Sequence, residues 1–367
     1  MILDELALAF IPKLGPRGVA HLIDLYHTAE SVYAQPYFAL HLCAMLRQDL
    51  VDKIIGKTGY AEAERELRYC EANGISITPA NDNNYPHLLR EIPDRPHIVY
   101  SLGDITTLNS PHILSVVGTR RITSYGETLC ARIIPELAEM FPDLVVVSGL
   151  AFGVDAAAHR AALAAGVRTV AVLANKLPEI TPAQHNNLAK DIVAQGGAII
   201  TEVSSQSKQN GTLYIPRNRI IAGVADGLFI VESPTNGGSL STVKAADAYS
   251  RTIVAAPGRI TDSRSEGTNH LIKTNVAQLV TSARDIADAL GWEVEQSMPQ
   301  KMRYEPREVN TKEQSILSIL AEATDGLPLD TIADRTALPI AEVSAIMLNM
   351  ELSGLVRQLP GKLYILC

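Results

Sequence analysis

Short runs of β-branched and aliphatic residues alternate with alanine-rich segments through the middle of the chain. Six apolar runs share this pattern: residues 113–117, 144–147, 169–173, 198–200, 228–231 and 253–256. Small apolar residues fill the helical segments between them, as at 156–165 and 243–249. Strands buried on both faces have this apolar character, and strands that alternate with helices form a parallel sheet. The pattern therefore predicts a Rossmann-like, doubly wound α/β domain with ligands beyond the carboxyl ends of its strands.

The C-terminal end of the chain has a different pattern. It predicts three helices and then a hairpin, at residues 311–320, 329–337, 340–352 and 354–366. Three helices followed by a short hairpin is the element order of a winged helix. The segment before it, residues 291–310, loses all periodicity and contains Pro299 and Pro306, which is typical of a linker.

The N-terminal 75 residues predict several short helices around one turn rich in glycine and proline. This turn, residues 10–16, resembles the hairpin of a helix-hairpin-helix module, as found in SAM-like helical domains. The glycine of such a hairpin lets backbone amides at a helix start approach a phosphate. A plain helix–helix turn, broken by Gly15 and Pro16, accounts for the same residues. Both interpretations stay open at this point.

These patterns divide the chain into four parts. The predicted parts are an N-terminal helical domain at 1–75, a Rossmann-like domain with its N-terminal extension at 76–290, a linker at 291–310 and a winged helix at 311–367. A chain of 367 residues is long enough for two or three such domains.

Composition and the N-terminal residues indicate where the protein works. Hydrophobic residues make up 47% of the chain and charged residues 20%, which is typical of a folded protein. Residues 1–10 carry Asp4 and Glu5 without a basic residue, and no apolar run reaches membrane-spanning length. The four cysteines are scattered, with no histidine at metal-binding spacing. We expect a cytoplasmic protein with reduced thiols, no metal and no membrane contact.

Basic residues are concentrated in two windows that lack acidic residues. The net charge of −8 argues against a protein that coats nucleic acid indiscriminately, but local charge decides binding. Residues 105–126 contain Arg120 and Arg121, and residues 206–224 contain Lys208, Arg217 and Arg219. Arginine suits phosphate oxygens, and an aromatic ring such as Tyr214 offers a surface on which a base stacks. The alternative is that Arg217 or Arg219 pairs with an acid of the fold, such as Glu202 or Asp226, while Tyr214 is core.

Three turns of small and polar residues follow predicted strands and converge on one rim of the sheet. They are residues 118–121, 148–155 and 236–242. In the second turn, Gly149 and Gly153 let the backbone come close to an anion at a helix start. None of the turns is a Walker loop or a GxGxxG fingerprint. Together they predict a phosphate-bearing ligand and no nucleotide cofactor.

Other titratable residues of this domain do not form a recognisable catalytic set. Asp155 and His159 are four residues apart on a predicted helix, but no third metal ligand accompanies them. Glu202 and Glu232 end strands without a partner nucleophile or base. We interpret all four as structural residues or arginine partners.

Several motifs occur in the order found in one protein family. They are Val-Gly-Thr-Arg at 117–120, Ser-Gly-Leu-Ala-x-Gly-Val-Asp-x-x-Ala-His at 148–159, Pro-Arg-Asn-Arg-Ile-Ile-Ala-Gly at 216–223 and Gly-Ser-Leu at 238–240. Residues 85–89, 96–100 and 257–258 fit the same series. The chain closely resembles the DNA-processing protein A family, called DprA or Smf, over essentially its whole length.

The resemblance implies a non-catalytic protein. Family members bind single-stranded DNA, form homodimers and load the recombinase RecA onto strands covered by single-strand binding protein during natural transformation of competent cells. By motif match, the DNA site comprises Arg120, Gly149, Gly153, Lys208, Tyr214, Arg217, Asn218 and Arg219. The stacking role of Tyr214 rests on its place near the Arg-Asn-Arg motif.

The sequence departs from the family pattern at two places. The family's dimer helix carries a Leu-Ile pair, here Leu271 and Ile272, usually followed by a Gly-Ala turn. In this chain residues 273–277 make that turn one residue longer, which predicts an altered dimer surface. From residue 311 onward four basic residues stand against seven acidic ones, and 340–352 contain no basic residue. An acidic domain is poorly suited to bind the phosphates of duplex DNA, so we interpret the winged helix as a protein-contact module.

Two other functions fit parts of the sequence. LOG-type phosphoribohydrolases cleave nucleoside monophosphates with a PGGxGTxxE motif, which the Gly237-Gly238 turn resembles. Ala245, three residues after Thr242, stands where that motif requires its glutamate, which removes the acid–base group. A nucleotide-sensing regulator that binds promoter DNA through its winged helix is the third interpretation, and the acidic third helix argues against it.

Overall fold

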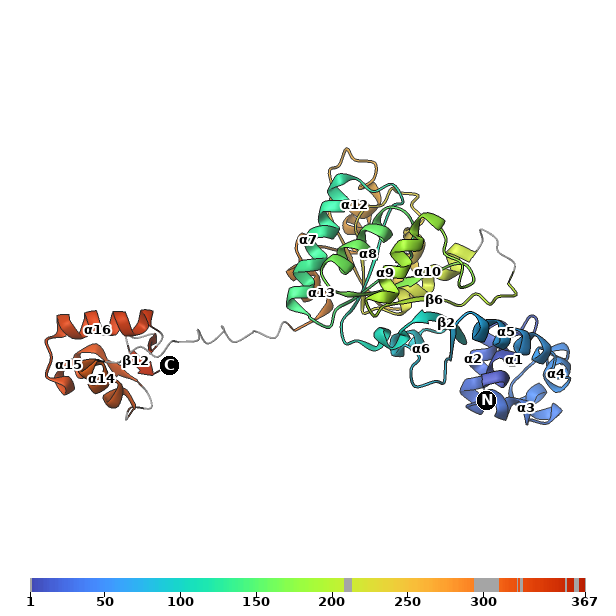
Figure 1. The fold of residues 1–367 in the computed structure, drawn as a ribbon, viewed down its shortest axis with the longest axis horizontal. Coiled ribbons are helices and arrows are strands. Elements are labelled where there is room, and N and C mark those ends of the chain that lie inside the picture. Colours follow the sequence, from blue (N-terminus) through green and yellow to red (C-terminus); the bar gives the residue numbers. More distant parts are fainter. Residues whose placement is uncertain are drawn as a thin grey trace. The chain divides into compact units, whose positions relative to one another are not determined.

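The computed structural model describes residues 2–207, 213–293, 310–321, 323, 326–353, 355–359 and 363–366 of the chain. It divides into two compact units, residues 1–295 and residues 296–367. Each unit is described by itself below, with the elements labelled as in Figure 1.

One mixed sheet forms the centre of the first unit. The nine strands found among the described residues lie in the order β1-β2-β6-β5-β4-β3-β7-β8-β9. Their bounds are β1 Ser76–Pro79, β2 Ile98–Gly103, β3 Ile113–Val117, β4 Val145–Ser148, β5 Arg168–Val172, β6 Ala198–Thr201, β7 Gly227–Ile230, β8 Thr252–Ala255 and β9 Gln278–Leu279. Strands β3 to β9 pair in parallel, whereas β1 and β2 add an antiparallel edge next to β6. The predicted doubly wound sheet is confirmed, and each of the six predicted runs overlaps a strand.

The strand order places a ligand-binding crevice between β3 and β7. From β3 the chain adds β4, β5 and β6 on one side, and it then returns to add β7, β8 and β9 on the other. At such a reversal the loops after the two neighbouring strands leave in opposite directions and open a crevice beyond their carboxyl ends. The turns that follow β3 and β7 therefore flank the expected binding position.

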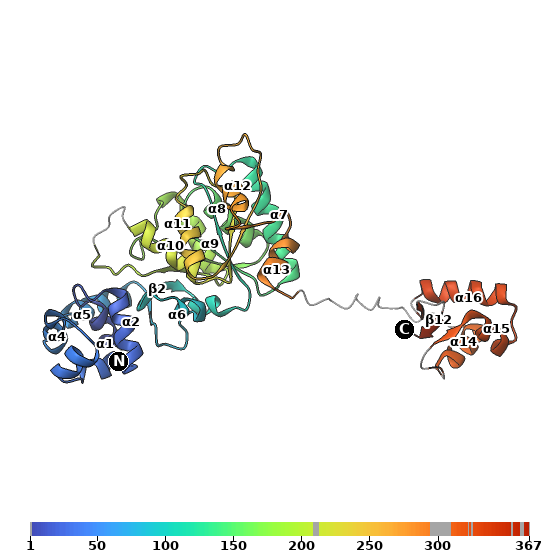
Figure 2. The ribbon, with the colours of Figure 1, turned by 180° about the vertical axis from the view of Figure 1, so that it is seen from behind.

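Helices cover both faces of this sheet, as Figures 1 and 2 show. One face packs against α7 Ser124–Met140, α8 Val154–Ala164 and α13 Ala283–Leu290. The other packs against α6 His87–Glu91, α10 Tyr214–Gly223, α11 Leu240–Ala248 and α12 Glu266–Lys273. Side chains of β3 alternate between the two layers: Ile113 and Val117 join the second, Leu114 and Val116 the first. This alternation explains why the strands are apolar throughout.

The N-terminal helices pack on the edge of the sheet that β1 and β2 form. They are α1 Ile2–Ala9, α2 Gly15–Tyr26, α3 Ala29–Tyr33, α4 Gln48–Ile55 and α5 Tyr60–Ala72, with a π-helical turn at Ala39–Cys43. Residues of α1 and α5 share one apolar cluster with β2, β6 and α9 Asn186–Ala194, while α2, α3 and α4 enclose a second. The predicted helical character is confirmed. The phosphate-binding interpretation of the turn at residues 10–16 stays a prediction.

The second unit is a winged helix. Its elements are α14 Thr311–Ala321, β10 Leu327–Pro328, α15 Leu329–Thr336, α16 Ile340–Leu352, β11 Val356–Leu359 and β12 Leu363–Leu366. The three strands form one sheet in the order β10-β12-β11. Its core contains Ile316, Ile332, Val343 and Met347. The predicted element order is confirmed, with the short β10 added between the first two helices.

Among the described residues, no helix is both long and apolar enough to cross a membrane. The same part of the chain contains no group of histidine, cysteine, aspartate and glutamate side chains arranged to hold a metal ion.

Candidate nucleic-acid interface

The crevice between β3 and β7 contains a cavity of about 760 Å³, which we call the rim cavity. Three segments form its walls. The turn after β3 contributes residues 118–121, the turn after β7 contributes residues 234–239, and α10 contributes residues 214–218 except Pro216. The first turns of α11 close the cavity with residues 240–244 except Val243. The cavity therefore lies where the strand order predicts a ligand.

Basic side chains dominate the charged lining of the rim cavity. The four basic lining residues are Arg120, Arg121, Arg217 and Lys244. Asp155 supplies the only carboxylate among the described lining residues, and it is buried. Arg120, Arg121 and Lys244 are exposed, so their charges face solvent. Such a lining attracts an anionic ligand even though the whole chain carries a net charge of −8.

Arg217 is buried under the floor of the cavity, with 5% of its surface exposed. Its Nη1 donates to the carbonyl oxygens of Gly149 at 2.7 Å and Val172 at 2.5 Å. Burial lowers the pKa of this guanidinium, and the nearby Asp155 carboxylate opposes that shift. Burial likewise raises the pKa of Asp155, with Arg217 opposing it. Arg217 thus ties α10 to the ends of β4 and β5.

The two glycines of the second turn make room for protein atoms. A Cβ on Gly149 would lie 2.1 Å from Nη1 of Arg217. A Cβ on Gly153 would lie 2.2 Å from the carbonyl oxygen of Thr119, and its φ of +79° is favourable only for glycine. Gly149 therefore makes room for the Arg217 side chain of α10, and Gly153 makes room for the backbone of the turn after β3. Their predicted contact with an anion stays a prediction.

Arg120 and Tyr214 pack against each other at the mouth of the rim cavity. The guanidinium carbon of Arg120 lies 5.1 Å from the centre of the Tyr214 ring, within the range of a cation–π contact. Arg120 is exposed and Tyr214 is half-buried. One surface thus offers a cation and an aromatic ring, the two features with which proteins bind the phosphates and bases of single-stranded nucleic acid.

Asn218 fixes the neighbouring turn. Its Nδ2 donates to Oγ of Ser241 at 2.7 Å, and that hydroxyl donates to the carbonyl oxygen of Gly238 at 2.7 Å. This chain of hydrogen bonds links α10 to the start of α11. The conformation of the glycine-rich turn therefore depends on Asn218.

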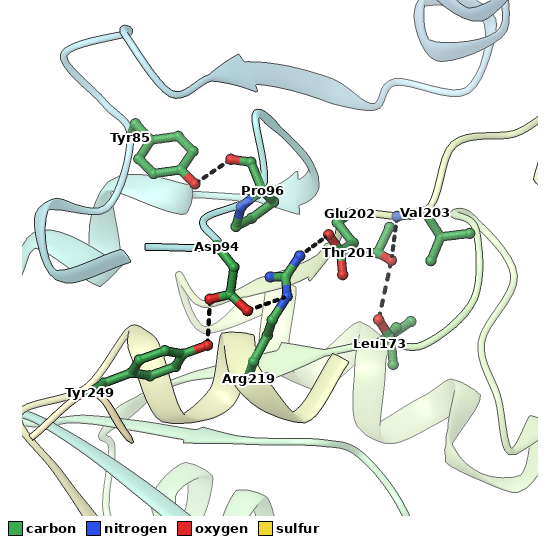
Figure 3. Close-up of polar contacts among 9 residues, drawn as sticks. All are labelled: Tyr85, Asp94, Pro96, Leu173, Thr201, Glu202, Val203, Arg219 and Tyr249. Atoms are coloured by element: carbon green, nitrogen blue, oxygen red, sulfur yellow. Dashed lines mark hydrogen bonds and ion pairs between the residues drawn. The ribbon is translucent and has the colours of Figure 1, made fainter. Parts of the chain in front are cut away.

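Arg219 lies away from the rim cavity. Its Nη2 pairs with Glu202 at 2.6 Å and its Nε lies 3.8 Å from Asp94 (Figure 3). Tyr249 donates its hydroxyl to the same Asp94 at 2.5 Å. Arg219 lines a separate cavity with Asp94, Glu202, Pro216 and residues 14–17. The structure therefore does not bring Arg219 together with Arg120 and Tyr214, and the alternative pairing with Glu202 is present.

Three further predicted residues are Lys208, Leu271 and Ile272. Lys208 lies outside the described residues. Leu271 is buried, and the half-buried Ile272 packs on the same core cluster. The side chains of this pair contribute to the chain's own core, and their predicted dimer contact stays a prediction.

The other titratable residues singled out in the sequence have structural partners. Nδ1 of His159 lies 2.7 Å from the hydroxyl of Thr169, and burial lowers its pKa to about 3. Glu232 accepts hydrogen bonds from the backbone N–H and the hydroxyl of Thr123, the residue before α7. These contacts agree with the structural interpretation of both residues.

Lys244 was not singled out in the sequence. It is exposed on the second turn of α11 and lines the rim cavity with Arg120. Acidic residues are favoured at the start of a helix, so a lysine soon after a glycine-rich turn is unusual and could have indicated an anion-binding position. Arg121 was noted within its acid-free window and also lines the cavity.

Comparison with known proteins identifies the family. The family model for DNA recombination-mediator protein A matches residues 76–291. The chain is 33% identical over 301 residues to Protein Smf of Escherichia coli strain K12, a match that covers 81% of this chain and 79% of that protein. The chain belongs to the DNA recombination-mediator protein A family. A second family model, the DprA winged helix domain, matches residues 300–362.

Other relatives agree with this assignment. DNA processing protein DprA of Bacillus subtilis strain 168 is 32% identical over 231 residues, covering 63% of this chain and 76% of that protein. The X-ray structure of DNA processing protein A from Streptococcus pneumoniae gives a TM-score of 0.67 at 26% identity and covers 78% of this chain and 98% of that chain. For the Helicobacter pylori protein, whose structure is described for its single-stranded DNA binding mode, the TM-score is 0.53 at 28% identity, with 59% and 96% covered. The resemblance found in the sequence is thereby confirmed.

Proposed function

We propose that this chain is a single-stranded DNA-binding recombination mediator and that DNA lies in the rim cavity. The observation that carries the proposal is the exposed Arg120 packed on Tyr214, beside a cavity whose other exposed charges are Arg121 and Lys244. Phosphates and bases are recognised by such a combination. The Helicobacter pylori relative, described as binding single-stranded DNA, supports the same ligand.

The side chains around the cavity divide into contact and positioning residues. Arg120, Arg121 and Lys244 are exposed and contact phosphates in this proposal. Tyr214 stacks on a base. Arg217 and Asn218 hold α10 against the neighbouring turns and therefore position the contact residues.

The cellular role follows the family. We propose that a cytoplasmic homodimer loads RecA onto strands held by single-strand binding protein during natural transformation. The dimer is proposed to use the helix that carries Leu271 and Ile272. Light scattering of a folded Ile272→Asp variant tests this surface, because a symmetric contact brings the two introduced charges together. An unchanged dimer mass would place the contact elsewhere.

We also propose that the protein is not a phosphoribohydrolase. Ala245 is partly buried against the core where that chemistry needs a glutamate, and the Asp155 carboxylate in the cavity wall is buried beside Arg217. Incubation with AMP should release no adenine. Release of adenine that stops in an Arg120→Ala variant would establish the enzyme instead.

The test of the main proposal is a comparison of ligands and salt concentrations. Fluorescence anisotropy should show binding of single strands in preference to duplex or free nucleotide. Removal of two phosphate contacts in an Arg120→Ala, Lys244→Ala variant should reduce the slope of log K against log salt by about 1.4, at about 0.7 per contact. Arg168 is exposed at the amino end of β5, whereas the rim cavity lies beyond the carboxyl ends of the strands, so Arg168→Ala is a control for the loss of a surface charge elsewhere. An unchanged slope in the double variant would rule out the rim cavity as the DNA site.

A further inference from the structure

A smaller cavity of about 160 Å³ lies beside the rim cavity, and we call it the Phe152 slot. It is lined by Arg120, Gly149, Ala151, Phe152, Thr181, Pro182 and Tyr214. We propose that this slot holds one nucleobase of the same DNA strand, stacked on Phe152. The inference rests on the proposed function and adds a second base-binding position to it.

The slot and the rim cavity share one wall. Arg120, Ala151 and Tyr214 line both cavities. A strand whose phosphate pairs with Arg120 therefore has one neighbouring nucleotide on the rim side and another on the slot side. Because Arg120 covers part of the Tyr214 ring, a base on the slot side needs an additional aromatic surface. Phe152 supplies that surface.

Phe152 is exposed although burial of an aromatic ring is favourable. Its side chain remains 46% exposed, whereas most large apolar residues of this domain are buried. The ring packs edge-on against His185, with 4.9 Å between the ring centres. His185 is itself buried, and its Nδ1 lies 2.7 Å from the carbonyl oxygen of Leu150. The exposed ring is thus held by a buried partner.

The backbone around Phe152 is held in an unfavourable conformation. Leu150 has a φ of +57° although it is a buried leucine, and Gly153 follows with a φ of +79°. Left-handed backbone is costly for leucine and persists only when the surroundings enforce it, as they often do at binding sites. Here His185 binds the Leu150 carbonyl, and Gly153 packs on Thr119. These contacts keep Phe152 at the rim.

The size and chemistry of the slot fit a base better than a phosphate. A cavity of roughly 150 Å³ accommodates a benzene ring, so the slot suits one planar ring system at its open mouth. Arg120 is the only charged residue in its described lining. The remaining lining is apolar or neutral, including Pro182 and Thr181. Stacking is tolerant of base identity, so the slot should accept any base.

An abasic scan tests this proposal on the full-length protein. The probe is the shortest oligothymidylate that the wild-type protein binds with full affinity, with one abasic position moved along it. We expect two sensitive positions, one for Tyr214 and one for Phe152, each costing about fivefold or more in affinity. In Phe152→Ala the intact oligonucleotide should bind about fivefold or more weakly, and one sensitive position should disappear. Phe152→Tyr should restore both the affinity and the position.

Phe38 provides the matched control. It is 63% exposed in the N-terminal region, so Phe38→Ala makes the same chemical change on another surface and should leave the scan unchanged. Thermal unfolding confirms first that each variant is folded. If folded Phe152→Ala keeps the wild-type affinity and both sensitive positions, the slot holds no base. Weaker binding with both positions retained would equally overturn the stacking role. Absence of binding by the wild-type protein would instead reject the proposed function.

Discussion

Arg217 and Gly149 form a hydrogen bond in which Nη1 of the arginine donates to the glycine carbonyl oxygen at 2.7 Å. The same nitrogen also donates to Val172, so one side chain of α10 joins the carboxyl ends of two parallel strands. The first residue of the Arg-Asn-Arg motif therefore positions the residues that we propose to contact DNA. Its own charge is largely shielded from solvent.

Replacement of Arg217 should destabilise the fold. Arg217→Ala leaves two buried carbonyl groups without this donor and leaves the buried Asp155 without its nearby cation. Loss of a buried hydrogen-bond donor that leaves its acceptors unsatisfied costs roughly 1–3 kcal/mol. Urea unfolding should show this loss, whereas the exposed Lys244→Ala should stay within about 0.5 kcal/mol of wild type. If Arg217→Ala kept normal stability but reduced the salt dependence of DNA binding, Arg217 would instead contact a phosphate directly.

Tyr214→Ala should weaken DNA binding without changing its salt dependence. A lost stacking contact costs about 1–3 kcal/mol per base, and the ring carries no charge that releases counterions. The guanidinium of Arg120, which packs on this ring, remains available to the phosphate. Anisotropy titrations at several salt concentrations give both quantities. A shallower slope in Tyr214→Ala would mean that the ring acts by holding Arg120 in place.

Loss of Arg219 should be most destabilising at neutral and alkaline pH. Burial raises the pKa of Glu202, and Arg219 opposes that rise. When the pKa of a carboxyl group is higher in the folded state than in the unfolded state, the free energy of unfolding falls as the pH rises through the folded-state pKa. Without Arg219 the pKa of Glu202 rises further, so Arg219→Ala should cost more near pH 8 than near pH 4, where Glu202 is protonated.

Urea unfolding of wild type and Arg219→Ala across this pH range measures the difference. Asp94 also lies near Arg219, so the same comparison in a Glu202→Gln background isolates Glu202. In that background the extra destabilisation near pH 8 should shrink, because residue 202 no longer ionises. A destabilisation that is the same at every pH would show that packing, and not the ion pair, explains the role of Arg219.

The alternation of buried strands and helices was predictable because it follows from burial on both faces. Strands β1 and β2 were not recognised. In β1 the burial runs from exposed Ser76 to buried Pro79, without the long apolar run of a central strand. A short edge strand of this kind gives a weak signal. The pairing of β1 with β2 and of β2 with β6 depends on contacts distant in sequence.

The roles of the two arginines could not be separated from the motif alone. Positions i and i+2 of a helix do not share a face, so Arg217 and Arg219 on α10 point to different surroundings. The partner Asp94 of Arg219 lies far away in the sequence, and only the folded sheet brings it near. Lys244 was missed for the same reason: β7 pairs with β3, and this pairing brings α11, which follows β7, to the same cavity as Arg120.

A chain that ends at residue 295 should bind single-stranded DNA almost as well as the full-length protein. Every residue of the rim cavity belongs to the first compact unit, and α16 of the winged helix contains no lysine or arginine. Phosphate contacts supply most of the affinity for DNA, so a unit with an acidic balance adds little. Anisotropy should therefore give affinities within about tenfold and equal salt slopes. A loss beyond tenfold, about 1.4 kcal/mol, with a shallower slope would show that the winged helix contacts phosphates directly. A loss with an unchanged slope would point to dimer formation, which concentration-dependent light scattering of the truncated chain would then detect.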